Sequence, residues 1–107
     1  MAEYKLLRIM IGEKERINGE IGYKHIIKFL MKNKIAGATA IRGIMGYGSS
    51  FKLHASTLLT LSEDLPIVIE VIDKKEKLEN VIPTLKTMLS GKGVITIEKI
   101  EIIYPEL

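Results

Sequence analysis

Two segments with the apolar spacing of an amphipathic helix alternate with runs typical of β-strands, and this order constrains the fold more than any other feature. Apolar side chains recur every three or four positions in residues 20–34 and again between Asp73 and Ser90. The two stripes are Tyr23, Ile26, Ile27, Leu30 and Met31, then Leu78, Val81, Ile82, Leu85 and Met88. The strand-like runs are residues 4–11, 38–47, 57–61 with 65–72, and 94–104. The order β-α-β-β-α-β predicts an α+β, ferredoxin-like fold: an antiparallel sheet with two helices on one face.

Local signals predict how the two helices begin and end. Gly37 provides a C-terminal stop for the first helix. Asp73 followed by Glu76 is close to a capping-box pattern, so we expect Asp73 to cap the second helix. Pro83 lies within the second apolar stripe and should kink that helix or start a new first turn, because proline lacks the backbone N–H.

Polar and proline positions predict the strand boundaries. Residues 12–19 are polar and predict a solvated turn after the first strand. The pair Leu65–Pro66 predicts a sheet edge or a bulge, because proline cannot donate to a strand ladder. The third strand, over residues 57–72, should therefore be long and irregular.

Length and composition indicate a small cytoplasmic protein. The 107 residues predict one domain, residues 1–107. The absence of cysteine excludes disulfides, thiolate metal sites and cysteine nucleophiles, and it fits a reducing cytoplasm. No segment approaches the roughly 20 apolar residues of a membrane span. A net charge of +3 is compatible with small anionic ligands but too weak to indicate nucleic acid as a partner.

The strands are more apolar than a sheet with one wet face requires. Residues 67–69 and 71–72 are almost continuously apolar, and the last strand adds Ile100, Ile102 and Ile103. Exposed apolar patches of this extent mark interaction sites, and a symmetric copy is the simplest cover. We therefore predict a homo-oligomer.

The candidate binding residues gather in two glycine turns. Glycine lets backbone N–H groups approach a ligand closely, and successive N–H groups form an anion-binding nest. The first turn is Gly46-Tyr47-Gly48, followed by Ser49, Ser50, Lys52 and His54, and the second is Gly91-Lys92-Gly93. The first turn has the alternative of a plain chain reversal, and the second that of a helix C-cap. Lys92 can act as a point-charge partner for phosphate.

The isolated charged residues each carry two interpretations. Arg42, in an apolar strand, must reach water, a carboxylate or a phosphate, so we expect a salt bridge between subunits or a ligand contact. Arg8 has the same alternatives, and His25 is expected to be structural. His25 and His54 are far apart and no cysteine is present, so no metal site is predicted.

The glycine turns and the order of elements resemble the nitrogen-regulatory PII signalling proteins. The shared features cover nearly the whole chain and comprise Gly37-Ala38-Thr39, Gly46-Tyr47-Gly48, the run 65–71 and Ser90-Gly91-Lys92-Gly93. The segment 42–48, the short loop with His54 and the run 62–66 look more like a smaller, largely uncharacterised PII-like family of bacteria and archaea.

This resemblance implies a homotrimer whose sheets face inward, with ligand clefts between the subunits. It implies an adenine nucleotide (ATP, ADP or AMP) as the ligand, held by Arg42, residues 46–50 and residues 91–93, with Lys52 and His54 in an effector loop. It also implies a regulatory protein without enzymatic activity that acts on a partner protein, such as a membrane transporter or channel. The loop 49–56 has no tyrosine, so the resemblance does not extend to uridylylation.

The residues fit three other functions to different degrees. A divalent-metal-binding trimer resembling the copper-tolerance proteins would draw ligands from His54 with Glu63, Asp64 or Glu70. An acylphosphatase-like enzyme shares the strand and helix order, but no nucleophile–base pair is evident. RNA binding through the sheet is rejected, because residues 57–72 contain none of the aromatics that stack on bases.

Overall fold

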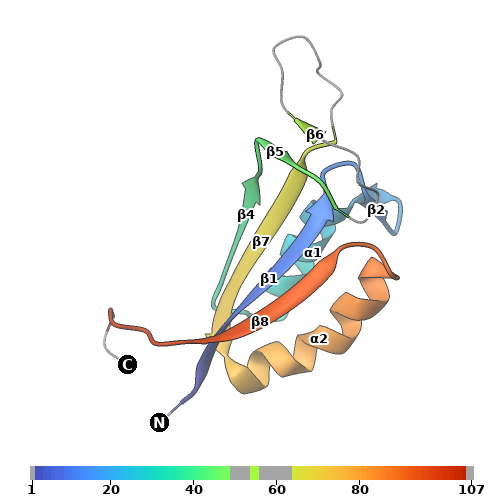
Figure 1. Cartoon of the computed structure of the whole chain (residues 1–107). Helices are drawn as coiled ribbons and strands as arrows, with labels where there is room; N and C mark the ends of the chain where they lie inside the picture. The colour runs from blue at the N-terminus through green and yellow to red at the C-terminus, as the bar shows by residue number, and fades with distance from the viewer. Residues whose placement is uncertain (1, 49–53, 56–63, 106–107) are drawn as a thin grey trace.

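The computed structural model describes residues 2–48, 54–55 and 64–105. Four antiparallel strands form one sheet in the order β4-β7-β1-β8, and both helices pack on the same face of it (Figure 1). The bounds are β1 Tyr4–Gly12, α1 Gly22–Lys32, β4 Gly37–Arg42, β7 Pro66–Lys74, α2 Lys75–Leu89 and β8 Val94–Ile100. The predicted ferredoxin-like fold is confirmed.

The core fills the space between the sheet and the helices. Alternate residues of β1 and β7 face the helices, because successive side chains of a strand point to opposite faces. The fully buried side chains come from these two central strands and from both helices, namely Leu7, Ile9, Ile26, Leu30, Ile67, Ile69, Val71, Leu78 and Leu85. Met31, predicted in the first apolar stripe, is instead 73% exposed, because it lies at the last turn of α1, away from the sheet.

The predicted turn at residues 12–19 contains a small hairpin, β2 Arg16–Ile17 with β3 Glu20–Ile21. The first helix therefore begins at Gly22 rather than residue 20. The N–H of Gly22 donates to the carbonyl of Glu15 (2.7 Å), and a Cβ on Gly22 would lie 2.9 Å from that oxygen. This close approach ties the start of α1 to the hairpin and excludes a larger residue.

The strand predicted over residues 38–47 is interrupted. It ends at Arg42, and a short second strand, β5 Met45–Gly46, pairs with β6 His54–Ala55. Gly43, between them, donates its N–H to the carbonyl of Pro66 (2.7 Å), where a Cβ would lie 2.8 Å from the proline ring. The pairing of β4 with β7 ends there, and the chain continues close to the Pro66 ring. The predicted strand 57–61 lies outside the described residues.

The prediction that Leu65–Pro66 marks a sheet edge or a bulge is wrong, because β7 is an interior strand and its register with β1 is continuous from Pro66 onward. Pro66 is the first residue of β7, an interior strand, opposite Gly12 of β1. Proline is tolerated at the first residue of a strand, and here its carbonyl still accepts a hydrogen bond from Gly43. The last strand is also shorter than predicted, ending at Ile100 instead of residue 104.

Asp73 does not cap the second helix, although the sequence pattern predicted it. Lys74 is the N-cap residue and makes no side-chain cap bond. Asp73 is 4% exposed and accepts hydrogen bonds from the N–H groups of Ala36 (2.9 Å) and Lys74 (2.7 Å). Burial alone would raise the pKa of Asp73, but these two donors and the nearby Lys77 ammonium outweigh it and lower the pKa. Asp73 thus ties the segment before β4 to the end of β7.

Pro83 lies inside α2 and does not end it. The alternative that a new helix starts at Pro83 is therefore wrong. The hydroxyl of Thr87 donates to the carbonyl of Pro83 (3.2 Å). Within the described residues, no helix is long and apolar enough to cross a membrane.

The face of the sheet away from the helices carries a complete apolar row. Strand register aligns one apolar residue from each of the four strands, and three of the four are more than a third exposed. The row is Ile41, Val68, Met10 and Val94. This is the surface that the sequence predicted to need a cover.

A charged cluster lies next to that row on the same face. Arg8 donates to the carboxylates of Glu70 (3.1 Å) and Glu98 (2.5 Å) from the two neighbouring strands. The hydrogen bonds to Glu98 and Glu70 raise the pKa of Arg8. Of the alternatives for Arg8, the salt bridge is therefore the one formed, within a single chain.

Candidate functional site

The two glycine turns lie at the same end of the sheet. Register pairs Ile11 with Ile67 and Ile67 with Arg42, while Met10 pairs with Val94. The last residues of β1 and β4 and the first residues of β7 and β8 therefore share one end. The turn 91–93 directly precedes β8, and the turn 46–48 follows β4 after residues 43–45.

The turn at residues 91–93 caps the second helix. Ser90 and Gly91 have positive φ angles (49° and 84°), and the N–H groups of Ser90 and Lys92 donate to the carbonyls of Lys86 and Leu89. This geometry confirms the C-cap reading of the sequence. The cap does not exclude a binding role, because the turn also borders a groove.

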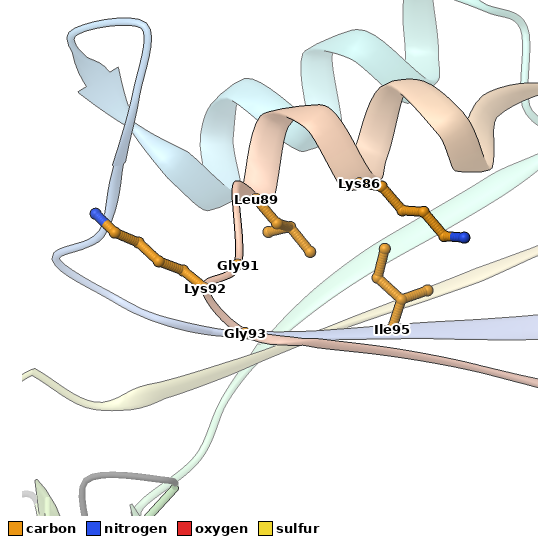
Figure 2. A pocket seen from close by; sticks show the side chains of 6 residues that line it. All are labelled: Lys86, Leu89, Gly91, Lys92, Gly93 and Ile95. Atoms are coloured by element: carbon orange, nitrogen blue, oxygen red, sulfur yellow. The ribbon is translucent and has the colours of Figure 1, made fainter.

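The groove beside this turn has a volume of about 310 Å³. It lies between the end of α2 and the start of β8, and its lining residues are Lys86, Leu89, Gly91, Lys92, Gly93 and Ile95 (Figure 2). Leu89 and Ile95 form an apolar centre, and the two lysine side chains extend from it in opposite directions. Leu89 is 5% exposed and belongs to the core, so the accessible lining is formed mainly by the turn, Ile95 and the two lysines.

Lys92 is held by an acidic residue that the sequence did not single out. Its ammonium lies 3.2 Å from the carboxylate of Glu15, in the loop after β1, and its side chain is 61% exposed. An exposed ion pair contributes at most about 1 kcal/mol. An incoming phosphate can therefore replace Glu15 at Lys92 at low cost.

Arg42 is paired in the same way, with Glu13 of the same loop. Its guanidinium thus has a carboxylate partner within its own chain, and a contact across a subunit boundary stays a prediction. The Arg42 side chain is 56% exposed, so it stays accessible to an anion. Glu13 and Glu15 together neutralise the two cations of the predicted site. The alternating charges of residues 13–16 were the available signal, but in the sequence they indicated only a solvated turn.

The first glycine turn is built against Pro66. A Cβ on Gly46 would lie 3.2 Å from the proline ring, whereas a Cβ on Gly48 would meet nothing within 4 Å. Tyr47 is 68% exposed, and the backbone of His54 pairs with Gly46. The other predicted residues of this part, Ser49, Ser50 and Lys52, lie outside the described residues.

The two turns are connected to opposite edge strands of the sheet. The first turn follows β4 and the second precedes β8. The first turn also packs over the start of the interior strand β7, where a Cβ on Gly46 would lie 3.2 Å from the Pro66 ring.

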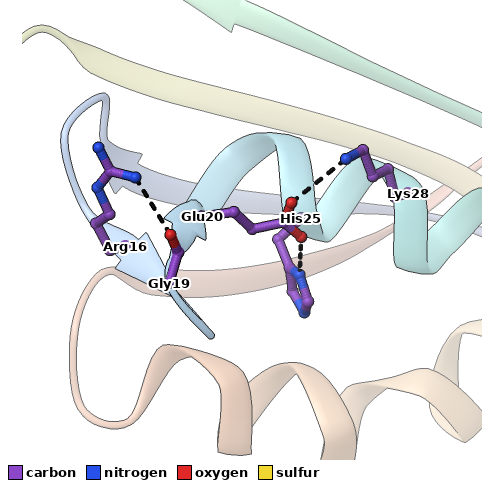
Figure 3. Close-up of polar contacts among 5 residues, drawn as sticks. All are labelled: Arg16, Gly19, Glu20, His25 and Lys28. Atoms are coloured by element: carbon purple, nitrogen blue, oxygen red, sulfur yellow. Dashed lines mark hydrogen bonds and ion pairs between the residues drawn. The ribbon is translucent and has the colours of Figure 1, made fainter.

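His25 has the structural role expected from the sequence. Its Nδ1 contacts the carboxylate of Glu20, which also lies 3.3 Å from the Lys28 ammonium (Figure 3). The hydrogen bonds from His25 and Lys28 lower the pKa of Glu20. In the same view, Arg16 donates to the carbonyl of Gly19 (3.3 Å) and closes the hairpin.

Two carboxylates of the metal alternative are occupied elsewhere. Asp64 accepts a hydrogen bond from the N–H of Lys14 (2.8 Å), and Glu70 pairs with Arg8. In the part of the chain that the structure describes, no three His, Cys, Asp or Glu side chains are grouped to hold a metal ion. The Glu63 and His54 side chains lie outside that part.

Solved structures with the same fold define the class of this protein. The PII-like protein CPII of Thiomonas intermedia K12, whose structure holds ADP, AMP and bicarbonate, aligns with a TM-score of 0.72 and 17% identity, covering 96% of this chain and 91% of that one. The divalent ion tolerance protein CutA1 of Ehrlichia chaffeensis aligns with a TM-score of 0.68 and 15% identity, over 98% and 88%. The chain thus has a PII-like fold.

Sequence similarity then identifies the family. The family DUF190, described as "Uncharacterized ACR, COG1993", matches residues 4–102. A UPF0166 protein of Aquifex aeolicus is 37% identical over 102 residues, which is 94% of this chain and 93% of that protein. The chain belongs to the DUF190 family, and the predicted membership of a small uncharacterised PII-like family is confirmed.

Proposed function

We propose that the protein is a regulatory sensor that binds an adenine nucleotide, with the phosphates between the two glycine turns. The observation that carries this proposal is the pair of exposed cations at one end of the sheet, Arg42 and Lys92, each held by a carboxylate of one loop. The likeness of fold to a PII-like protein solved with ADP and AMP supports the choice of ligand.

The residues present fit a nucleotide in their chemistry. Ile95, which is partly buried in the groove, offers an apolar contact to a base, and Lys92 suits a phosphate at its side. Phosphate oxygens would replace Glu15 at Lys92 and Glu13 at Arg42. Both glutamates would then be released, which couples ligand binding to the conformation of the loop after β1.

We propose a homotrimer in which the apolar row and the Arg8 cluster of each sheet face the other copies. The row of four apolar residues that crosses the sheet supports this cover. The assembly would place the β8 edge of one copy beside the β4 edge of the next and so complete the ligand cleft. The ligand would favour one conformation of the segment after Gly48, and a partner protein would read that conformation. The role proposed is non-catalytic.

Titration calorimetry of ATP, ADP and AMP, with the mass in solution measured alongside, tests this function. Lys92→Ala should weaken binding about tenfold, as expected for the loss of one charge-assisted contact. Lys99→Ala is the matched control, because Lys99 is also an exposed lysine paired with a glutamate, Glu3, at the other end of the sheet. Glu15→Gln should tighten binding by removing the competing carboxylate. If a well-formed trimer binds none of the three nucleotides, the proposal is wrong.

Binding of a divalent metal, as the likeness to CutA1 suggests, is the alternative. Asp64 and Glu70 are engaged by Lys14 and Arg8, so we do not propose it as the main function. Titration of the same protein with divalent cations separates the two.

A further inference from the structure

A second groove lies on the helix side of the sheet, between α1 and the edge strand β4. Its volume is about 380 Å³, and it is lined by Tyr23, Lys24, Ile27, Lys28, Ala38 and Ala40. The floor is apolar, and two lysines lie among its lining residues. In the described sheet β4 pairs only with β7, so it is an edge strand. The backbone N–H and C=O groups along its outer edge have no ladder partner in that sheet. The apolar floor, the two lysines and the free strand edge suit an extended apolar segment that carries an acidic residue.

The chain itself carries such a segment. Residues 101–105 continue beyond β8 as a tail that projects from the body of the protein (Figure 1). Ile103 and Tyr104 are 84% and 88% exposed, the two largest exposed fractions among the exposed large apolar side chains. Glu101 precedes them in the sequence. Two adjacent exposed apolar side chains offer a contact surface to another molecule.

We propose that the tail of one copy, residues 101–105, docks in the groove between α1 and β4 of a second copy. The tail leaves from β8, at the opposite edge of the sheet from β4, so the groove it fills belongs to another chain. Ile103 or Tyr104 covers the apolar floor, and Glu101 lies near Lys24 or Lys28. Strand addition to a free edge supplies backbone hydrogen bonds in known peptide complexes.

This contact deepens the trimer of the proposed function and rests on it. It is heterologous, joining the β8 side of one copy to the β4 side of the next, and such contacts close into rings. A ring of this kind also brings the two glycine turns of neighbouring copies toward each other. The tail would act as a strap between neighbouring copies at the end of the sheet opposite the glycine turns, where Ile100 pairs with Tyr4.

Cysteine pairing tests the contact directly, because the chain has no cysteine of its own. Tyr104→Cys and Ala40→Cys chains are mixed, refolded together and oxidised. A disulfide between the two variants should form, since it requires Cβ atoms about 3.5–4.5 Å apart. Thr84→Cys, an exposed position on α2, replaces Ala40→Cys in the control and should give little cross-link.

A second variant measures the strength of the contact. The double substitution Ile103→Ser with Tyr104→Ser should weaken association about 100-fold, because each buried large apolar side chain contributes about tenfold. Met31→Ser, which is exposed on α1 but outside the groove, should leave association unchanged.

The outcomes separate the two proposals. A monomeric parent protein would overturn both the trimer and the strap. An oligomeric parent whose Tyr104→Cys chain pairs equally with both partners, or whose double serine variant associates normally, would overturn the strap alone.

Discussion

Replacing Gly93 by alanine should be far more damaging than the same change at Gly91, two residues away. Both glycines have positive φ angles (73° and 84°), so each alanine bears a backbone cost of about 1–2 kcal/mol. A Cβ on Gly93 would also lie 2.3 Å from the carbonyl oxygen of Met10, in a central strand, whereas a Cβ on Gly91 would meet nothing within 4 Å. The overpacking adds about 1–3 kcal/mol, so Gly93→Ala should cost about 2–5 kcal/mol in total.

Urea denaturation of both variants measures this difference in the free energy of unfolding. Domains of this kind have about 5–15 kcal/mol of stability, so Gly91→Ala should remain folded while Gly93→Ala loses a large part of it. Equal losses for the two variants would refute the reasoning. The pair also guides binding experiments: a loss of nucleotide binding in Gly93→Ala reports on the fold, whereas Lys92→Ala reports on the site.

Two further predictions concern charged residues. Asp73→Ala should cost about 2–4 kcal/mol at pH 7 in chemical denaturation, because it leaves two N–H donors without their acceptor, while Asp73→Asn should cost less. Because the folded pKa of Asp73 is lowered, its contribution is present above the unfolded value of about 3.9 and lost as the pH falls through the lower folded value. The wild-type protein should thus lose more stability than Asp73→Asn below about pH 4, and parallel acid profiles would contradict this. Arg8→Ala should weaken subunit association about tenfold or more by ultracentrifugation, since Glu70 and Glu98 would be left as like charges on the covered face; unchanged association would place that face outside the interface.

The locally encoded features were the predictable ones. The period of the apolar residues located both helices, and the excess of apolar residues in the strands indicated an unfilled sheet face, which the structure shows as the row containing Met10 and Val94. The C-cap at residues 90–93 also followed from its glycines. Apolar periodicity and turn chemistry depend only on residues that are close in the sequence. The sequence is therefore sufficient to predict them.

Features that depend on distant neighbours were missed or misread. Asp73 and Glu76 match a capping box, yet the Asp73 carboxylate turns to the N–H of Ala36, far back in the sequence. Pro66 reads as an edge residue, yet it begins an interior strand, because the first position of a strand has no need of its N–H at that point in the ladder.

The proposed binding site was also predictable only in part. The sequence by itself determined which residue types can bind an anion: the two glycine turns, Arg42 and Lys92. Only the tertiary structure decided that these cations sit at one end of the sheet and that Glu13 and Glu15 hold them. The physical reason is that an ion pair depends on distance in space, and strand order sets that distance between residues that the chain keeps far apart.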